Sequence, residues 1–179
     1  EGAVKYAWMK EYYPAQYEEM KKFIESGRWH ISGASWDATD TLVPSIESAI
    51  RNIMLGQDYY RKEFGVESTD IFLPDCFGFG WTLPAIASHC GLIGFSSQKL
   101  QWRNKPFYGN DKYPFTVGLW QGIDGSTIMM THGYDYNQRF EDGDLSENKD
   151  LLELTGHSPL HMVYRYYGTG DIGGSPTLE

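Results

Sequence analysis

The spacing of apolar residues predicts helices in the first third of the chain. Apolar residues between 3 and 25 recur at helical spacing, but Pro14 lies in the middle of them. Proline lacks an amide hydrogen and clashes with the preceding turn, so we expect two helices that meet at this residue. A longer helix is predicted over 45–64, where Ser45 can cap the first turn and Gly65 can end the last one.

Short apolar runs predict strands in the rest of the chain, at residues 28–35, 70–73, 92–96 and 161–167. A predicted helix over 82–90 separates two of them, and the order strand, helix, strand is typical of parallel βαβ units. Two further β-like runs flank Asp124 and Gly125, a dipeptide favoured in hairpin turns. A short helix is predicted over 146–155, with Gly156 as its end.

These elements together predict an α/β fold, with a mostly parallel β-sheet or an irregular barrel, flanking helices and a β-hairpin. With 179 residues, of which 41% are hydrophobic and 22% charged, the chain can bury a core. It contains no internal repeat and no convincing domain boundary. We therefore expect residues 1–179 to form a single α/β unit.

The charge balance limits the possible partners. A formal net charge of -9 argues against nucleic acid and anionic membrane surfaces, because both attract basic patches. It suits a neutral substrate or a bound cation. No apolar run is long enough to span a membrane, so we expect a soluble chain of the cytoplasm or periplasm, without a choice between them. Each of the two cysteines, Cys76 and Cys90, is interpreted as a buried reduced thiol.

Asp75, in the segment LPDCFGFG, is the first candidate for chemistry. It follows a predicted strand, and ligands of parallel α/β folds bind at the carboxyl ends of strands. The alternative is that Asp75 caps the following turn or helix, a common role for aspartate.

Asp171, in GTGDIGGSP, also follows a predicted strand. With Asp75 it could form the nucleophile and acid pair of a glycosidase, or it could be a turn residue of a glycine loop. The three glycines at 168, 170 and 173 match a dinucleotide fingerprint, but Ser175 and Pro176 are poor material for the helix that this motif requires.

For two further groups of polar residues, the sequence favours a structural interpretation over a metal site. Asp37 and Asp40 could bind a metal, but a structural loop in which Asp caps a turn is the favoured reading. His157 and His161 have the spacing of a zinc helix, which Pro159 would break. No complete metal site can be assembled from the spacings in this chain.

Several stretches resemble the α-mannosidases of glycoside hydrolase family 38, in a bacterial-type form. They are YAWMKEYYP, IFLPDCFGFGWTLPAIASHCGLIGFSSQKLQW, PFTVGLWQGIDGSTIMMTH and YGTGDIGGSPT. The resemblance runs from about residue 6 to 177 and is most specific over 68–102. It implies an internal segment of the N-terminal catalytic α/β domain, with the family's N- and C-terminal parts not present.

The resemblance also implies a function. The family removes terminal α-linked mannose from glycans with retention of configuration, in a zinc-dependent site. Asp75 matches the residue that is both nucleophile and zinc ligand, and Asp171 matches the acid/base. Lys99, Trp102 and, further on, Tyr134 and Asp135 fall where the family places substrate contacts.

The other zinc ligands of the family, a His-x-Asp pair and a later His, have no match here and are expected outside this segment. The implied partner is a mannose-containing oligosaccharide. Two alternatives stay open. One is a carbohydrate-binding domain without chemistry, which would tolerate loss of Asp75. The other is a metal-dependent enzyme of the polysaccharide deacetylase type, which would need histidines close to Asp75.

Overall fold

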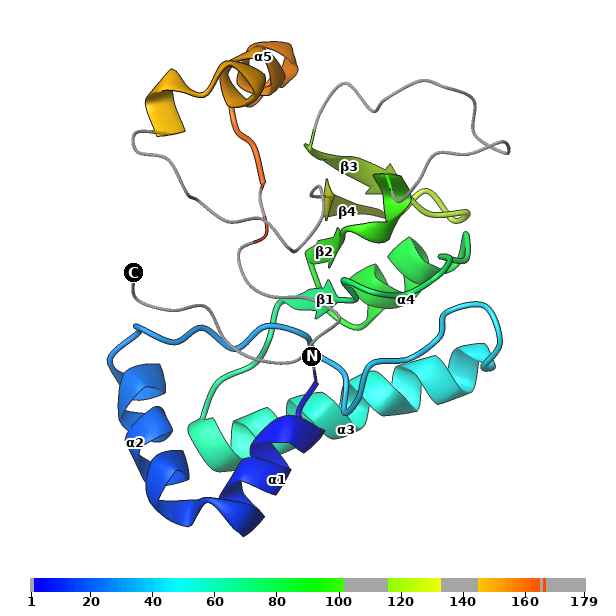
Figure 1. Ribbon diagram of the computed structural model, residues 1–179. Coiled ribbons are helices and arrows are strands. Elements are labelled where there is room, and N and C mark those ends of the chain that lie inside the picture. Colours follow the sequence, from blue (N-terminus) through cyan, green and yellow to red (C-terminus); the bar gives the residue numbers. More distant parts are fainter. Residues whose placement is uncertain (1, 102–115, 133–144, 165, 167–179) are drawn as a thin grey trace.

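A computed structural model describes residues 2–101, 116–132, 145–164 and 166 (Figure 1). Its helices are α1 (Val4–Tyr12), α2 (Pro14–Glu25), α3 (Ile46–Phe64), α4 (Leu83–His89) and α5 (Lys149–His157). Its strands are β1 (Asp70–Phe72), β2 (Gly94–Ser97), β3 (Val117–Gln121) and β4 (Thr127–His132). Two short 3-10 helices, η1 (Lys99–Gln101) and η2 (Leu145–Glu147), complete the described elements.

The described strands form one open sheet in the order β1-β2-β4-β3. β1 pairs with β2 in parallel, β2 pairs with β4 in parallel, and β3 and β4 form an antiparallel hairpin. The predicted α/β class, the mostly parallel sheet and the hairpin at Asp124-Gly125 are thus confirmed. Of the two predicted sheet forms, the described strands adopt the open one.

Local sequence signals set the ends of the helices. The Ser45 hydroxyl accepts the amide of Ser48 at 3.2 Å and caps α3, as predicted. Gly65 ends the same helix with φ at 68°, a left-handed conformation that glycine adopts without strain. α1 ends just before Pro14, which begins α2.

The core lies between the sheet and the helices α3 and α4 (Figure 1). Its buried members come from the sheet, both helices and the loops between them: Ala34, Ile53, Ile71, Leu73, Leu83, Ile86, Ala87, Leu92, Phe95 and Ile128. Burying each large aliphatic side chain contributes roughly 1.5–3 kcal/mol. A second cluster joins α1, α2 and the end of α3 around Tyr17, Met20 and Ile24.

The segment 33–37 is tied between α3 and β1. Ala34 donates its amide to the carbonyl of Asp70, and the buried Tyr60 hydroxyl donates to the carbonyl of Gly33 at 3.0 Å. The side chain of Asn52 holds the backbone of Asp37 on both sides, as acceptor and as donor. These bonds fix the start of the loop that later borders the candidate site.

Three predictions of local structure were wrong. Residues 28–35 form no strand, because Gly33 turns left-handed with φ at 84°. The described residues of 161–167 form none either, since His161 has φ at 51°. The predicted helix 146–155 is divided into η2 and α5, because the Asn148 carboxamide caps α5 by accepting the amide of Leu151, and α5 continues past Gly156.

None of the described helices combines the length and the apolar character that crossing a membrane requires.

We expect Gly56→Ala to destabilise the fold. A methyl group at this position would lie 2.5 Å from the carbonyl carbon of Ser35 and even nearer to the carbonyl oxygen of Ala34. The helix would have to move off the 33–37 segment, at a cost of about 1–3 kcal/mol. Gly156→Ala in α5 is the matched control, because no atom lies within 4 Å of the added carbon. This control should gain up to about 1 kcal/mol from helix propensity. Equal urea midpoints for the two variants would contradict the packing argument.

A second prediction concerns acid stability. Lys10 donates to both carboxylate oxygens of Glu63 at 2.7 Å, and the Tyr17 hydroxyl donates to one of them at 2.9 Å. The hydrogen bond from Lys10 lowers the pKa of Glu63 below its usual 4.5. A depressed carboxyl pKa stabilises the fold above about pH 4.5, and this contribution is lost as the pH falls through the lower folded value.

Glu63→Gln should therefore be less stable than the parent protein at pH 6, and the difference should shrink below pH 4. Thermal unfolding across this range measures it. Glu47→Gln is the control, since the ion pair of Glu47 with Arg51 is exposed on both sides and contributes little. A gap between parent and Glu63→Gln that stays constant down to pH 3 would contradict the prediction.

Candidate functional site

The carboxyl ends of the parallel strands β1, β2 and β4 share one edge of the sheet, and candidate residues follow each of them. Asp75 lies in the turn after β1, and Lys99 begins η1 directly after β2. His132, the last residue of β4, is fully buried and pairs in register with Ser97. Ligands of open α/β sheets bind at this edge, as predicted for Asp75.

The side chains of Asp75 and Lys99 form an ion pair. The Lys99 ammonium lies 2.7 Å from Oδ1 of Asp75, and the Lys99 side chain is only 8% exposed, whereas that of Asp75 is 52% exposed. The same ammonium lies 4.8 Å from the centre of the Phe77 ring, close enough for a cation–π contact. The carboxylate is therefore held from the protein side and open on the other.

Asp75 also borders a hollow of about 350 Å³. The hollow is lined by the loop 38–40 and by the turn after β1, namely Ala38, Thr39, Asp40, Leu73, Pro74, Asp75, Cys76 and Phe77. Phe77 is 73% exposed. A hollow with a carboxylate and an exposed aromatic face can hold a sugar ring, whose C–H face packs on aromatic side chains.

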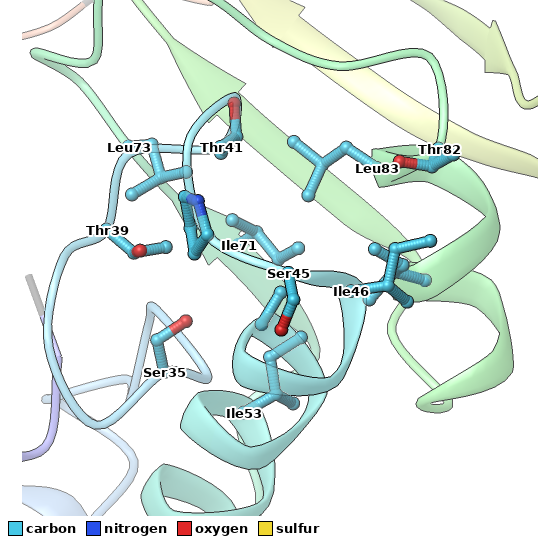
Figure 2. A pocket seen from close by; sticks show the side chains of 13 residues that line it. Ser35, Thr39, Thr41, Ser45, Ile46, Ile53, Ile71, Leu73, Thr82 and Leu83 are labelled. Atoms are coloured by element: carbon cyan, nitrogen blue, oxygen red, sulfur yellow. The ribbon is translucent and has the colours of Figure 1, made fainter.

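Two other hollows lack acidic side chains. One, of about 460 Å³, has aromatic and apolar lining with Trp81 and Trp120. The other is a cavity of about 40 Å³ between α3, α4 and β1, where aliphatic side chains and hydroxyl groups face inward (Figure 2). Of the three, the hollow at Asp75 is the one with carboxylates in its lining, those of Asp40 and Asp75, and a carboxylate can act as nucleophile or proton carrier.

The alternative interpretation of Asp75 as a cap of the following helix does not fit the geometry. α4 begins eight positions later at Leu83, and no side chain caps its N-terminus. Capping describes Asp40 instead, because Oδ1 of Asp40 accepts the amides of Leu42 at 2.7 Å and Val43 at 3.1 Å. The structural interpretation of the segment WDATD is thus supported for Asp40.

The residues that the structure describes do not by themselves make a zinc site. No three His, Cys, Asp or Glu side chains come together among them as metal ligands. Asp75 is one carboxylate, and an ammonium lies against one of its oxygens. His157 lies in α5 and His161 follows it with left-handed backbone, so the two do not share a helix face.

Other predicted site residues lie outside the described part of the chain. These are Asp171, Trp102, Tyr134 and Asp135. The separation of the Asp75 and Asp171 carboxyl groups stays a prediction. Lys99 is described, and its position against Asp75 is compatible with the substrate contact that the resemblance implied.

Sequence reasoning missed Phe77 as a site residue. Asp75 and Phe77 are two positions apart and both exposed, whereas Cys76 between them is half-buried. This alternation along LPDCFGFG was the signal that could have found it. Both cysteines are half-buried and outside any disulfide, and burial raises the pKa of the Cys90 thiol, which fits an inert reduced group.

Comparison with known proteins decides the family. Residues 2–178 match the family described as Glycosyl hydrolases family 38 N-terminal domain. The chain belongs to glycosyl hydrolase family 38. One relative is the protein named Alpha-mannosidase G, of Dictyostelium discoideum. The two sequences are 38% identical over an alignment that covers 97% of this chain and 16% of the relative. The chain thus spans about one sixth of the length of that curated relative.

Solved structures support the same fold. An alpha-mannosidase from Enterococcus faecalis V583 superposes with a TM-score of 0.59 and 22% identity, over 73% of this family 38 chain and 14% of that chain. A 4-alpha-glucanotransferase from Thermococcus litoralis superposes with a TM-score of 0.68 and 14% identity, over 93% and 26% of the two chains. At these identities the superpositions show the fold alone, so the activity must be argued from the site.

The ion pair of Asp75 with Lys99 gives a testable prediction. A double-mutant cycle with Asp75→Asn and Lys99→Met, read by urea unfolding, should give a coupling energy of about 1 kcal/mol, because one partner is buried and the other half-exposed. The matched control is the more exposed pair of Asp58 and Lys62 in α3, for which about 0.3–0.5 kcal/mol is expected. A coupling at the site no larger than the control would show that the pair is not held.

Proposed function

We propose that this chain carries the nucleophile of a retaining α-mannosidase and that Asp75 is that nucleophile. The observation that supports this most is the position of Asp75 in a family 38 chain. It lies past the carboxyl end of a parallel strand, on the rim of a hollow, with Lys99 at one oxygen and Phe77 beside it. The substrate class is a glycan with a terminal α-linked mannose.

In the proposed reaction, Asp75 attacks the anomeric carbon of the terminal mannose. A carbon–oxygen bond forms to the carboxylate while the bond from that carbon to the leaving oxygen breaks. A second carboxylic acid, for which Asp171 is our candidate, gives its proton to the leaving oxygen. In the second half, the same residue takes a proton from water, which attacks the anomeric carbon and releases Asp75.

The neighbours of Asp75 have separate tasks in this proposal. Lys99 donates to Oδ1 and so limits the rotation of the carboxylate, which keeps it aimed at the sugar. Phe77 supplies the apolar platform for the C–H face of the mannose. Retention of configuration requires the carboxyl groups of the nucleophile and the acid/base residue to lie roughly 5–5.5 Å apart.

Zinc dependence is also a proposal for the intact protein. A bound zinc ion would polarise sugar hydroxyls as a Lewis acid. Asp75 could contribute one oxygen, and the remaining ligands would come from residues outside this segment. The described residues do not assemble such a site by themselves.

The decisive experiment measures hydrolysis of an aryl α-mannoside by the intact protein. Asp75→Ala should lower kcat by about 10³-fold or more, because the covalent route is lost. Asp58→Ala, on the exposed face of α3, is the control and should leave kcat unchanged. A fluorinated mannosyl substrate should make the covalent intermediate accumulate. Mass spectrometry should then find one fluorinated hexosyl group on the peptide that contains Asp75.

The same assay separates the alternatives. Activity that survives Asp75→Ala would refute the mechanism, and sugar binding without hydrolysis would favour a carbohydrate-binding domain. Chelation should abolish activity and added zinc should restore it. Activity that chelation leaves untouched would refute the proposed zinc dependence but not the role of Asp75.

A further inference from the structure

Among the described residues, two backbone hydrogen bonds tie the start of the turn that carries Asp75 to the sheet. Leu73, just before the turn, donates its amide to the carbonyl of Ser96 at 3.0 Å. Beyond it, the carbonyl of Pro74 accepts the amide of Gln98 at 3.4 Å. Both bonds lie before Asp75, so the residues that follow it need support from other contacts, since small displacements of reacting groups cost large factors in rate.

That support comes from the loop 39–42, which lies against the other side of the turn. The Thr41 hydroxyl donates to the carbonyl of Gly78 at 2.6 Å. The Cys76 thiol donates to the carbonyl of Thr39 at 3.0 Å. A methyl group on Gly78 would lie 2.6 Å from the Leu42 side chain, so loop and turn are in close contact.

The pattern of ties alternates along the turn. Cys76 and Gly78 are half-buried and anchored to the loop, whereas Asp75 and Phe77, which line the hollow together with Cys76, are exposed. The two residues assigned to the reaction are thus placed by the residues that alternate with them. Figure 2 shows Thr41 and Leu73 close together at one end of the small cavity, where the loop lies over the end of β1.

The loop itself is shaped before it meets the turn. Oδ1 of Asp40 accepts the amides of Leu42 and Val43, which closes a tight turn around Thr41. The Thr39 hydroxyl donates to the carbonyl of Asp40, within the same loop. Of the two threonine hydroxyls, that of Thr41 reaches across to the turn and that of Thr39 does not.

We propose that Thr41 is a positioning residue for the mannosidase reaction: its hydroxyl holds the carbonyl of Gly78 and thereby fixes the turn that presents Asp75 and Phe77. This inference rests on the proposed function. Thr41 is not among the residues that line the hollow at Asp75, so its effect passes through the backbone of the turn. Removing the hydroxyl should lower the rate of the chemical step more than it weakens the binding of substrate.

The test uses Thr41→Val, Thr41→Ser and Thr155→Val in the intact protein, with an aryl α-mannoside as substrate. Thr41→Val keeps the shape but loses the donor, and should lower kcat by about 10–100-fold with KM changed less than about threefold. Thr41→Ser keeps the donor and should restore kcat to within about threefold of the parent. Thr155→Val is the matched control, because the Thr155 hydroxyl also donates to a backbone carbonyl at 2.6 Å but does not line the hollow at Asp75. Its kcat should stay within about twofold of the parent.

Several outcomes would overturn the inference. They are parent-like kcat in Thr41→Val, failure of Thr41→Ser to restore kcat, or equal losses in Thr41→Val and Thr155→Val. Unfolding of the variant could also lower kcat. If Thr41→Val has a lower melting temperature and its kcat returns to the parent value when the assay is run well below that temperature, the inference is overturned. An active Asp75→Ala would refute the proposed function, whereas an inactive Asp75→Ala beside a parent-like Thr41→Val refutes this inference alone.

Discussion

The parallel pairing of β1 with β2 is the constraint on which the candidate site depends. The register sets Ile71 opposite Phe95 and Phe72 opposite Ser96, so both strands reach the same edge of the sheet. A shift by one residue would turn the buried Ile71 and Phe95 away from the core, which makes the register costly to change. The adjacency of Asp75 and Lys99 is therefore fixed by hydrophobic burial and not by their own attraction.

A second contact, between α3 and the segment 33–37, also supports this arrangement. At Gly56 the backbone of α3 touches the carbonyl groups of Ala34 and Ser35, and no larger residue fits there. The loop that begins at this contact reaches the hollow at Thr39 and Asp40. The packing of one helix against one short backbone segment thus helps to determine where the wall of the hollow stands.

Local signals in the sequence were enough to predict most elements of the fold. The cap at Ser45, the end at Gly65 and the hairpin dipeptide each act within a few residues, so they can be read without knowledge of the rest. The expected strand over 28–35 does not form. Among the described residues, one backbone hydrogen bond, from Ala34 to Asp70, joins this segment to β1, and Gly33 has a left-handed backbone. Such a feature depends on the tertiary contacts, which apolar spacing does not encode.

In the candidate site too, the sequence predicts the features that depend on local signals and misses those that depend on tertiary contacts. Asp75 could be predicted because it follows an apolar run and precedes a glycine-rich turn. Its pairing with Lys99 could not, because the two residues follow different strands and meet only through the register of the sheet.

The architecture of this protein does not determine its chemistry, which depends on the residues at the ends of the strands. An alpha-mannosidase and a glucanotransferase share the architecture, so the sheet and helices do not select the substrate. What selects it must be the side chains that the strand ends present and the backbone that aims them. In the site proposed for this chain, those are a half-exposed carboxylate, an ammonium at one of its oxygens and an exposed ring. Asp75 and Asp40 are both exposed and line the same hollow, and they differ in what holds Oδ1, which is the Lys99 ammonium for Asp75 and two backbone amides for Asp40.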